Sequence, residues 1–230
     1  MKFDFEDYLA NFDYDEKHDD IIKIATEYMD EYGDPSSLSN NDRELALIFS
    51  ELSTNSLGFK KLESLPEPDT PIFQVLVREL LLHAYFFGSF GCIKSYKKSF
   101  DLASQIAHVS RAAQWCLGFL YLNGHYVEKD YSKAFKFLIA AALQRNAYAH
   151  DLLGDINVLG LGVPINKPMA YAWYNLACYL APKKEEYKKK RNDLEKELTN
   201  KEIDFAQNIA SELIDSNYRK LRSLGFLLDY

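Results

Sequence analysis

The sequence has few residues that break helices: 10 glycines and 7 prolines among 230 residues. This scarcity argues against a loop-rich all-β fold, which needs many turns. No stretch of 18 uncharged apolar residues occurs, which argues against a membrane-spanning helix and a membrane partner. The first seven residues lack the basic and then apolar pattern of a secretory signal. The three cysteines form no Cys-x-x-Cys pair, so we expect reduced thiols and a cytoplasmic protein.

Residues that carry out chemistry are scarce as well. None of the 5 histidines lies three or four residues from another, so no helical metal-binding pair exists. Glu79 and His83 are four residues apart, but their segment differs from the His-Glu-x-x-His of zinc proteases. Neither a Gly-x-Ser-x-Gly nucleophile motif nor a phosphate-binding glycine loop is present. We therefore expect no catalytic residue, no metal and no cofactor.

Charge is distributed unevenly along the chain. Residues 1–70 hold 18 acidic and 6 basic residues, a net of −12, while the rest holds 16 and 21, a net of +5; together they give −7. An acidic chain repels phosphate backbones, so nucleic acid is a poor partner and a basic protein a better one. Three prolines at positions 66–71 mark a boundary between an acidic N-terminal block, 1–70, and a second region, 71–230.

Apolar residues recur at helical spacing, and no segment beyond residue 70 alternates as a strand does, so we predict an all-α fold. A shift of 36 residues superposes the chain on itself. By this shift Ala113, Leu117, Gly118, Gly124, Val127, Ala134 and Ala141 match Ala149, Leu153, Gly154, Gly160, Val163, Ala170 and Ala177. A weaker copy lies upstream, at about residues 71–107. A helix pair of this length cannot bury its apolar face alone, so pairs stack.

Each repeated position has a physical reason. Gly118 and Gly154 let the neighbouring helix approach closely, because they lack a side chain. A glycine six residues later ends the first helix of each pair with a positive φ. Asp130 and Asn166 match each other and are expected to cap the second helix.

This pattern resembles the Sel1-like repeat family, a relative of the tetratricopeptide repeat. The strong copies are 113–146 and 149–178, and the segment after them resembles the capping helices of bacterial members, with Thr199 and Glu202 as a capping box. The resemblance covers about residues 71–215. It implies a right-handed α-α superhelix with C-terminal capping helices. We expect residues 1–70 to be a helical cap on the first repeat, since an end repeat otherwise exposes apolar surface.

The same resemblance implies a non-catalytic scaffold or adaptor that binds a partner protein in a concave groove, lined by the first helix of each pair. The inward positions are then Glu79, His83, Phe86, Trp115, Phe119, Leu122, Tyr148, Asp151, Asp155 and Val158. This set contains three acids and no base, which suits a partner that carries Arg or Lys. Two alternatives are an immunity protein that neutralises a bacterial toxin and a hydrolase built on helical repeats. The sequence does not name the partner, the pathway or the oligomeric state.

A basic run at 183–191 follows the last copy. Glu185 and Glu186 are expected to pair with Lys189 and Lys190, four residues further on. We therefore interpret the run as a solvated helix rather than as a nucleic-acid or membrane patch.

Overall fold

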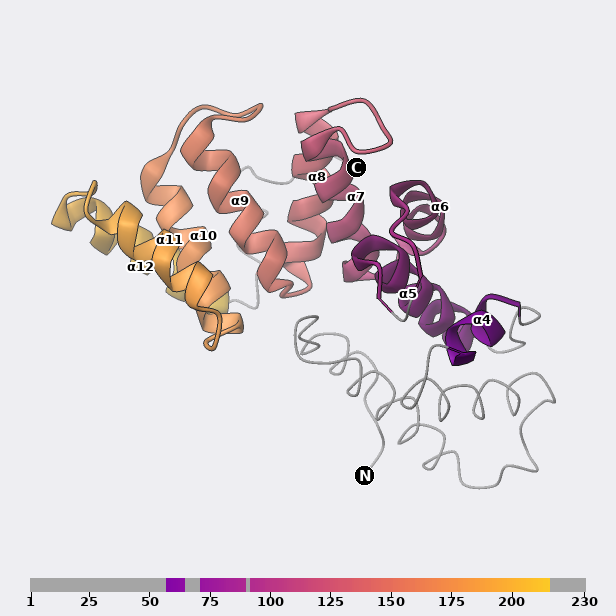
Figure 1. Ribbon diagram of the computed structural model, residues 1–230. Helices are drawn as coiled ribbons and strands as arrows, with labels where there is room; N and C mark the ends of the chain where they lie inside the picture. The colour runs from indigo at the N-terminus through magenta and orange to yellow at the C-terminus, as the bar shows by residue number, and fades with distance from the viewer. Residues whose placement is uncertain (1–56, 65–70, 90–91, 216–230) are drawn as a thin grey trace, which may run out of the picture. The chain divides into compact units, whose positions relative to one another are not determined.

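The computed structural model describes residues 57–64, 71–89 and 92–215, and this part of the chain is helical, without a strand. The all-α prediction is therefore confirmed. The described helices are, in chain order, α4 (Leu57–Ser64), α5 (Pro71–Phe87), α6 (Tyr96–Ile106), α7 (Arg111–Asn123), α8 (Tyr131–Leu143), α9 (Ala147–Leu159), α10 (Lys167–Leu180), α11 (Glu185–Glu195) and α12 (Asn200–Asp215), as Figure 1 shows. They divide into two compact units, the first ending at Ala113 and the second beginning at Gln114.

Each repeat is a pair of helices closed by the same backbone hydrogen bond. The N–H just before the second helix donates to a carbonyl near the end of the first: Ser95 to Tyr85 at 2.8 Å, Asp130 to Tyr121 at 3.0 Å and Asn166 to Asn157 at 2.9 Å. The first of these loops is one residue longer. The upstream copy accordingly aligns at a shift of 36 residues before its loop, where Tyr85 matches Tyr121, and at a shift of 35 after it, where Lys98 matches Lys133.

Side-chain caps begin the second helix of every pair. Asp130 accepts a hydrogen bond from the Lys133 N–H at 2.9 Å, and Asn166 accepts one from the Met169 N–H at 3.0 Å. Both caps were predicted. In the first pair Ser95 does the same for α6, accepting from the Lys98 N–H. The glycines that end the first helices have φ near +70°, as expected.

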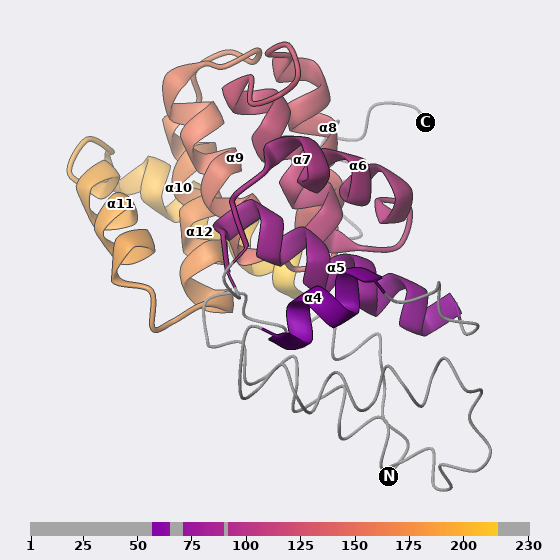
Figure 2. The same cartoon turned by 45° about the vertical axis from the view of Figure 1, so that its right-hand side comes forward.

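Within the second unit, glycine sets how closely paired helices approach. A Cβ added to Gly118 would lie 2.7 Å from Cγ of Leu138 on α8, and one added to Gly154 would lie 2.3 Å from Cε1 of Tyr174 on α10. Real Cβ atoms do not come so close to another carbon. Figures 1 and 2 show α9 and α10 side by side in two views. The predicted close approach is therefore confirmed at both glycines.

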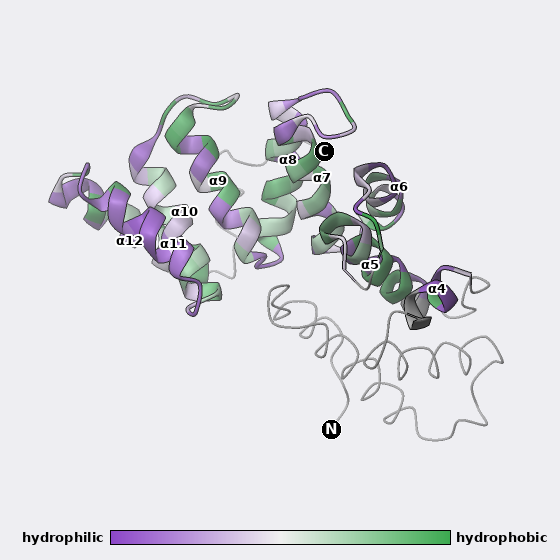
Figure 3. Cartoon of the chain, in the orientation of Figure 1, coloured by the Kyte–Doolittle hydropathy of each residue, from purple (hydrophilic) through white to green (hydrophobic). Residues whose placement is uncertain are grey.

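The two helices after the last repeat both pack against α10. Tyr171 on α10 donates a hydrogen bond to Glu195 at the end of α11, and Trp173 is completely buried. Ahead of α12, the Thr199 N–H donates to Glu202 at 2.9 Å and the Glu202 N–H donates back to the Thr199 hydroxyl, so the predicted capping box is confirmed. Figure 3 shows α11 and α12 as mostly hydrophilic, as helices with one solvent-facing side are.

Of the acidic block 1–70, only α4 is described. Its Glu63 pairs with Lys98 of α6 at 2.7 Å and accepts a hydrogen bond from the Tyr85 hydroxyl of α5. Leu62 is buried as well, so this end of the block packs on the first helix pair. The remainder of the predicted cap lies outside the described residues.

Substitution of Gly154 by alanine tests the close approach of α9 and α10. Alanine normally stabilises a helix relative to glycine, by about 1 kcal/mol. Here the new methyl group would collide with the buried Tyr174 ring, so Gly154→Ala should lower the free energy of unfolding by about 1–3 kcal/mol. Urea denaturation measures this, with Asn208→Ala on the exposed side of α12 as the control. A Gly154→Ala protein as stable as the original would contradict the packing argument.

Candidate partner-binding surface

The ten residues predicted to line a groove differ in exposure. Six are buried in the folded chain: Glu79, His83, Phe86, Trp115, Leu122 and Asp151. The other four, Phe119, Tyr148, Asp155 and Val158, are partly exposed and all belong to the second unit. These four are therefore the predicted residues that a partner can touch directly.

The three predicted residues of the first copy lie on α5 and contact their own unit. Glu79 accepts a hydrogen bond from the Ser110 hydroxyl, which itself caps α7 by accepting from the Ala113 N–H. Burial raises the pKa of Glu79 to about 6, against the opposing effects of the Ser110 hydrogen bond and the Arg111 charge. The His83 ring lies 4.7 Å from that of Phe87. The Phe86 ring meets those of Phe87 and Tyr96 edge-on, so each of the three side chains has a role inside the fold.

In the second unit, four aromatic side chains follow one another in contact: Phe119, Trp115, Tyr148 and Tyr187. We call them the aromatic row. Their successive ring centroids lie 6.0, 5.2 and 6.2 Å apart. Tyr148 and Tyr187 also pack on a small apolar cluster of Ala177, Cys178 and Ala181. The row joins α7, α9 and α11, and it is partly open to solvent at Phe119 and Tyr148.

Beside the aromatic row lies an ion cluster formed by Asp151, Asp155, Tyr174 and Lys190. The Lys190 ammonium, on α11, lies 2.8 Å from Oδ2 of Asp151 and 2.8 Å from Oδ2 of Asp155. The Tyr174 hydroxyl donates to Oδ1 of Asp155 at 2.8 Å, and the Tyr174 ring faces the ammonium at 5.8 Å. Two acids and one base leave the cluster with a net charge of about −1.

Burial dominates the electrostatics of this cluster. It raises the pKa of Asp151 to about 6, although the hydrogen bond from Lys190 opposes the rise and the Asp155 charge adds to it. Burial and the Asp155 charge likewise raise the pKa of the Tyr174 hydroxyl. Oδ1 of Asp151 is buried and accepts no hydrogen bond within the described part of the chain. An unsatisfied buried acceptor of this kind is costly.

Two expectations about charge are corrected here. The predicted inward set contains no base, but α11 supplies one to it, because Lys190 lies between Asp151 and Asp155. Lys190 therefore pairs across to α9 instead of with Glu186 on its own helix, and Glu185 pairs with Lys188 at 2.7 Å rather than with Lys189. For Lys190 the four-residue spacing rule failed because two acids of α9 lie within 2.8 Å and are less exposed to water.

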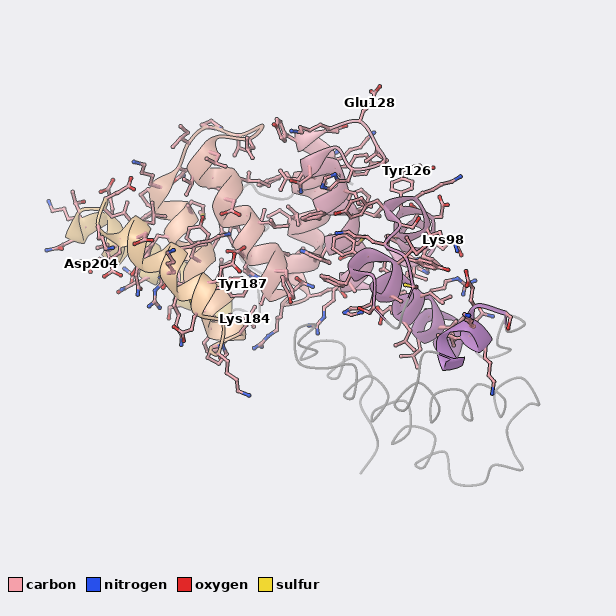
Figure 4. The ribbon with its side chains drawn as sticks, viewed as in Figure 1. Lys98, Tyr126, Glu128, Lys184, Tyr187 and Asp204 are labelled. Atoms are coloured by element: carbon pink, nitrogen blue, oxygen red, sulfur yellow. The ribbon has the colours of Figure 1, made fainter. Side chains whose placement is uncertain are left out.

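Sequence reasoning missed three residues of α11 and its N-terminal cap: Lys184, Tyr187 and Lys190. Figure 4 labels Lys184 and Tyr187 near the start of α11. The Lys184 ammonium lies 5.9 Å from the Tyr148 ring centroid, and Tyr187 meets the same ring edge-on. These residues are 35 to 39 positions from their partners on α9, and nothing local in the sequence indicates these contacts.

The helix pairs described above can be compared with known proteins. The family model of the Sel1 repeat matches residues 82–108, 111–146 and 147–181. A Sel1 repeat protein from Oxalobacter formigenes has the same fold, with 19% identity and a TM-score of 0.53 over 69% of this chain and 65% of that chain. A protective antigen of uropathogenic Escherichia coli strains, displaying an SLR fold, has 19% identity and a TM-score of 0.48 over 91% of this chain and 57% of that chain. This chain thus spans less than two thirds of either protein.

A comparison with curated proteins gave no match. The helix pairs, each with a capped second helix and two of them with glycine at the close approach, define a helical-repeat protein of the α-solenoid class. More specifically, residues 82–181 contain three matches to the Sel1 repeat. The predicted resemblance and fold class are confirmed. Repeats of this kind form protein-interaction scaffolds.

Two further observations concern the described residues alone. No helix among them is long and apolar enough to cross a membrane. No group of three or more His, Cys, Asp or Glu in the same ranges is arranged to hold a metal ion. Cys116 and Cys178 are buried, as expected of cysteines inside apolar helices.

Replacement of Glu79 by glutamine tests the electrostatic cost of this buried acid. The pKa of Glu79 is raised in the folded protein, from 4.5 to about 6, so the native state binds more protons than the unfolded state between these values. The contribution of Glu79 to stability is therefore highest below pH 4.5 and is lost as the pH rises through 6. As the pH rises from 4.5 to 7, the free energy of unfolding of Glu79→Gln should therefore increase by about 2 kcal/mol relative to that of the original protein.

Chemical denaturation of both proteins at several pH values measures this difference. The buried His150, whose pKa burial lowers to about 4, acts in the opposite direction, but it is present in both proteins and cancels. A stability difference that does not change with pH would show that Glu79 is not held in a protonation-sensitive environment.

Proposed function

We propose that this protein is a non-catalytic adaptor that binds a partner protein at the exposed face of its second unit. The partner-binding surface consists of the partly exposed side chains of Phe119, Tyr148, Asp155 and Val158. Support comes from the combination of aromatic and acidic groups on two neighbouring repeats. Tyr148, Asp155 and Val158 share one face of α9, because residues seven and ten positions apart recur on the same side of a helix.

The single observation that carries the proposal is the aromatic row, with Phe119 and Tyr148 partly open beside an ion cluster of net negative charge. Aromatic side chains bury a large area at a low cost in conformational entropy, so they dominate binding at protein interfaces. The neighbouring acids favour a partner segment that carries basic residues. Binding to such a partner would weaken at high salt concentration.

The sequence also allowed an immunity protein against a bacterial toxin and a hydrolase. A toxin with a basic active-site face would suit the same surface, so the immunity role is a special case of the adaptor. Toxin neutralisation and hydrolysis stay alternative predictions. Their readouts are protection of cells from the toxin and turnover of a substrate, and neither is needed for the experiment below.

The test compares capture of partners by the original chain and by a double variant, Phe119→Ala with Tyr148→Ala. We expect the double variant to bind the captured partner at least tenfold more weakly, since two central aromatic contacts are lost. Purified partner and isothermal titration calorimetry give the dissociation constant, and circular dichroism verifies that the variant is folded. Both side chains are only partly buried, so the fold should tolerate their truncation.

The matched control is Phe205→Ala, which removes an exposed aromatic ring of α12, a helix that contributes no residue to the aromatic row. It should bind the partner as tightly as the original chain. A folded double variant that keeps full affinity would reject this surface, and equal loss in the Phe205→Ala protein would indicate that any exposed aromatic ring serves.

A further inference from the structure

The ion cluster contains a charge imbalance and an unused acceptor in the same place. Asp151 is only 8% exposed, and its Oδ2 shares the Lys190 ammonium with Asp155, whose Oδ1 is satisfied by Tyr174. Oδ1 of Asp151 is the remaining carboxylate oxygen, and no described residue donates a hydrogen bond to it. A single ammonium therefore serves two carboxylates and leaves one buried acceptor unsatisfied.

An arginine side chain fits these groups better than lysine does. Its guanidinium is planar and presents five N–H donors, so it can bond both oxygens of one carboxylate and still reach a second. It is also less strongly hydrated than an ammonium and stacks well on aromatic rings. The Tyr174 ring already faces the cation position at 5.8 Å, which provides such a surface.

Lys190 is suited to leaving this position. Its side chain and that of Asp155 are both 28% exposed, so water reaches the pair and screens it. A lysine side chain has a flexible four-carbon stem and can move its ammonium into solvent without moving the helix backbone. Departure of the ammonium would uncover the carboxylates from the solvent side while α11 stays in place.

We propose that Lys190 occupies, in the free protein, the binding position of an arginine of the partner, and that binding exchanges one cation for the other. This inference rests on the proposed function and names the chemistry of its partner: a segment with an arginine that enters between Asp151 and Asp155, beside the aromatic row. Lys190 then acts as an internal competitor. Removing it should strengthen binding, whereas loss of a purely structural ion pair would not.

The experiment uses the full chain and a defined probe, the peptide Gly-Ser-Arg-Ser-Gly, titrated by NMR. Lys190→Ala should bind this peptide about tenfold more tightly than the original chain. The matched control is Lys189→Ala, an exposed neighbour on the same helix that changes the net charge equally. It should bind the peptide as the original chain does.

Two further comparisons test whether the binding position requires Asp151 and whether it prefers arginine. In the double variant Lys190→Ala with Asp151→Asn the gain should disappear, whereas Asp204→Asn, an exposed acid labelled in Figure 4, should leave it intact. The increase in affinity caused by Lys190→Ala should be smaller for the peptide Gly-Ser-Lys-Ser-Gly than for the arginine peptide. If Lys190→Ala does not fold, Lys190→Met removes only the ammonium and keeps the aliphatic chain in place.

The proposal is overturned if Lys190→Ala binds the arginine peptide no more tightly than Lys189→Ala, if the gain survives Asp151→Asn, or if both peptides gain equally. None of these results affects the adaptor role, which is tested by the Phe119 and Tyr148 double variant with a captured protein. If the double variant loses capture but Lys190→Ala does not change peptide binding, the partner-binding surface is supported and the arginine-binding position is rejected.

Discussion

The close approach of the paired helices, which only glycine permits, sets the geometry of the second unit. At Gly154 the Tyr174 ring occupies the space where any other residue would place a Cβ. This contact brings the Tyr174 hydroxyl within hydrogen-bond distance of Asp155 on the facing helix. A larger residue at position 154 would separate α9 from α10 and so disturb the ion cluster as well as the packing. The constraint that stabilises the repeat therefore also positions Asp155, a residue of the proposed partner-binding surface.

The helices after the last repeat add side chains that the repeats themselves lack. The aromatic row begins on α7 and α9 but ends on α11 at Tyr187. The same helix brings a lysine to two acids of α9, which reduces the negative charge of the cluster without cancelling it. An α11 that served only to cover the apolar end of the stack would need no lysine directed at buried carboxylates. The repeats supply the residues of the proposed partner-binding surface, and the flanking helix α11 supplies the side chains beside it.

Much of the fold was predictable because the signals are local or periodic. The caps at Asp130 and Asn166, the glycines at 118 and 154, and the capping box at Thr199 each depend on residues within a few positions of one another or on the 36-residue period. Ser95 could have been found as the counterpart of Asp130 at a shift of 35 residues. The site was predicted less well, because burial and pairing depend on helices far apart in sequence. The period cannot indicate that α11 lies across α9, since α11 is not a repeat, and helical spacing then suggested the wrong partner for Lys190.

Asp151 shows why the ion cluster is better explained by binding than by stability. Its burial raises the pKa to about 6, which means that the fold pays for the charged form at neutral pH even with Lys190 nearby. Replacing a buried ion pair by apolar side chains is often neutral or stabilising, so packing alone would favour leucine at this position. The neighbouring positions of α9 that face the interior, Leu153 and Ile156, are indeed apolar and completely buried. A costly carboxylate near them, with Oδ1 unsatisfied and Oδ2 paired with a lysine, is what the proposed cation-binding position requires.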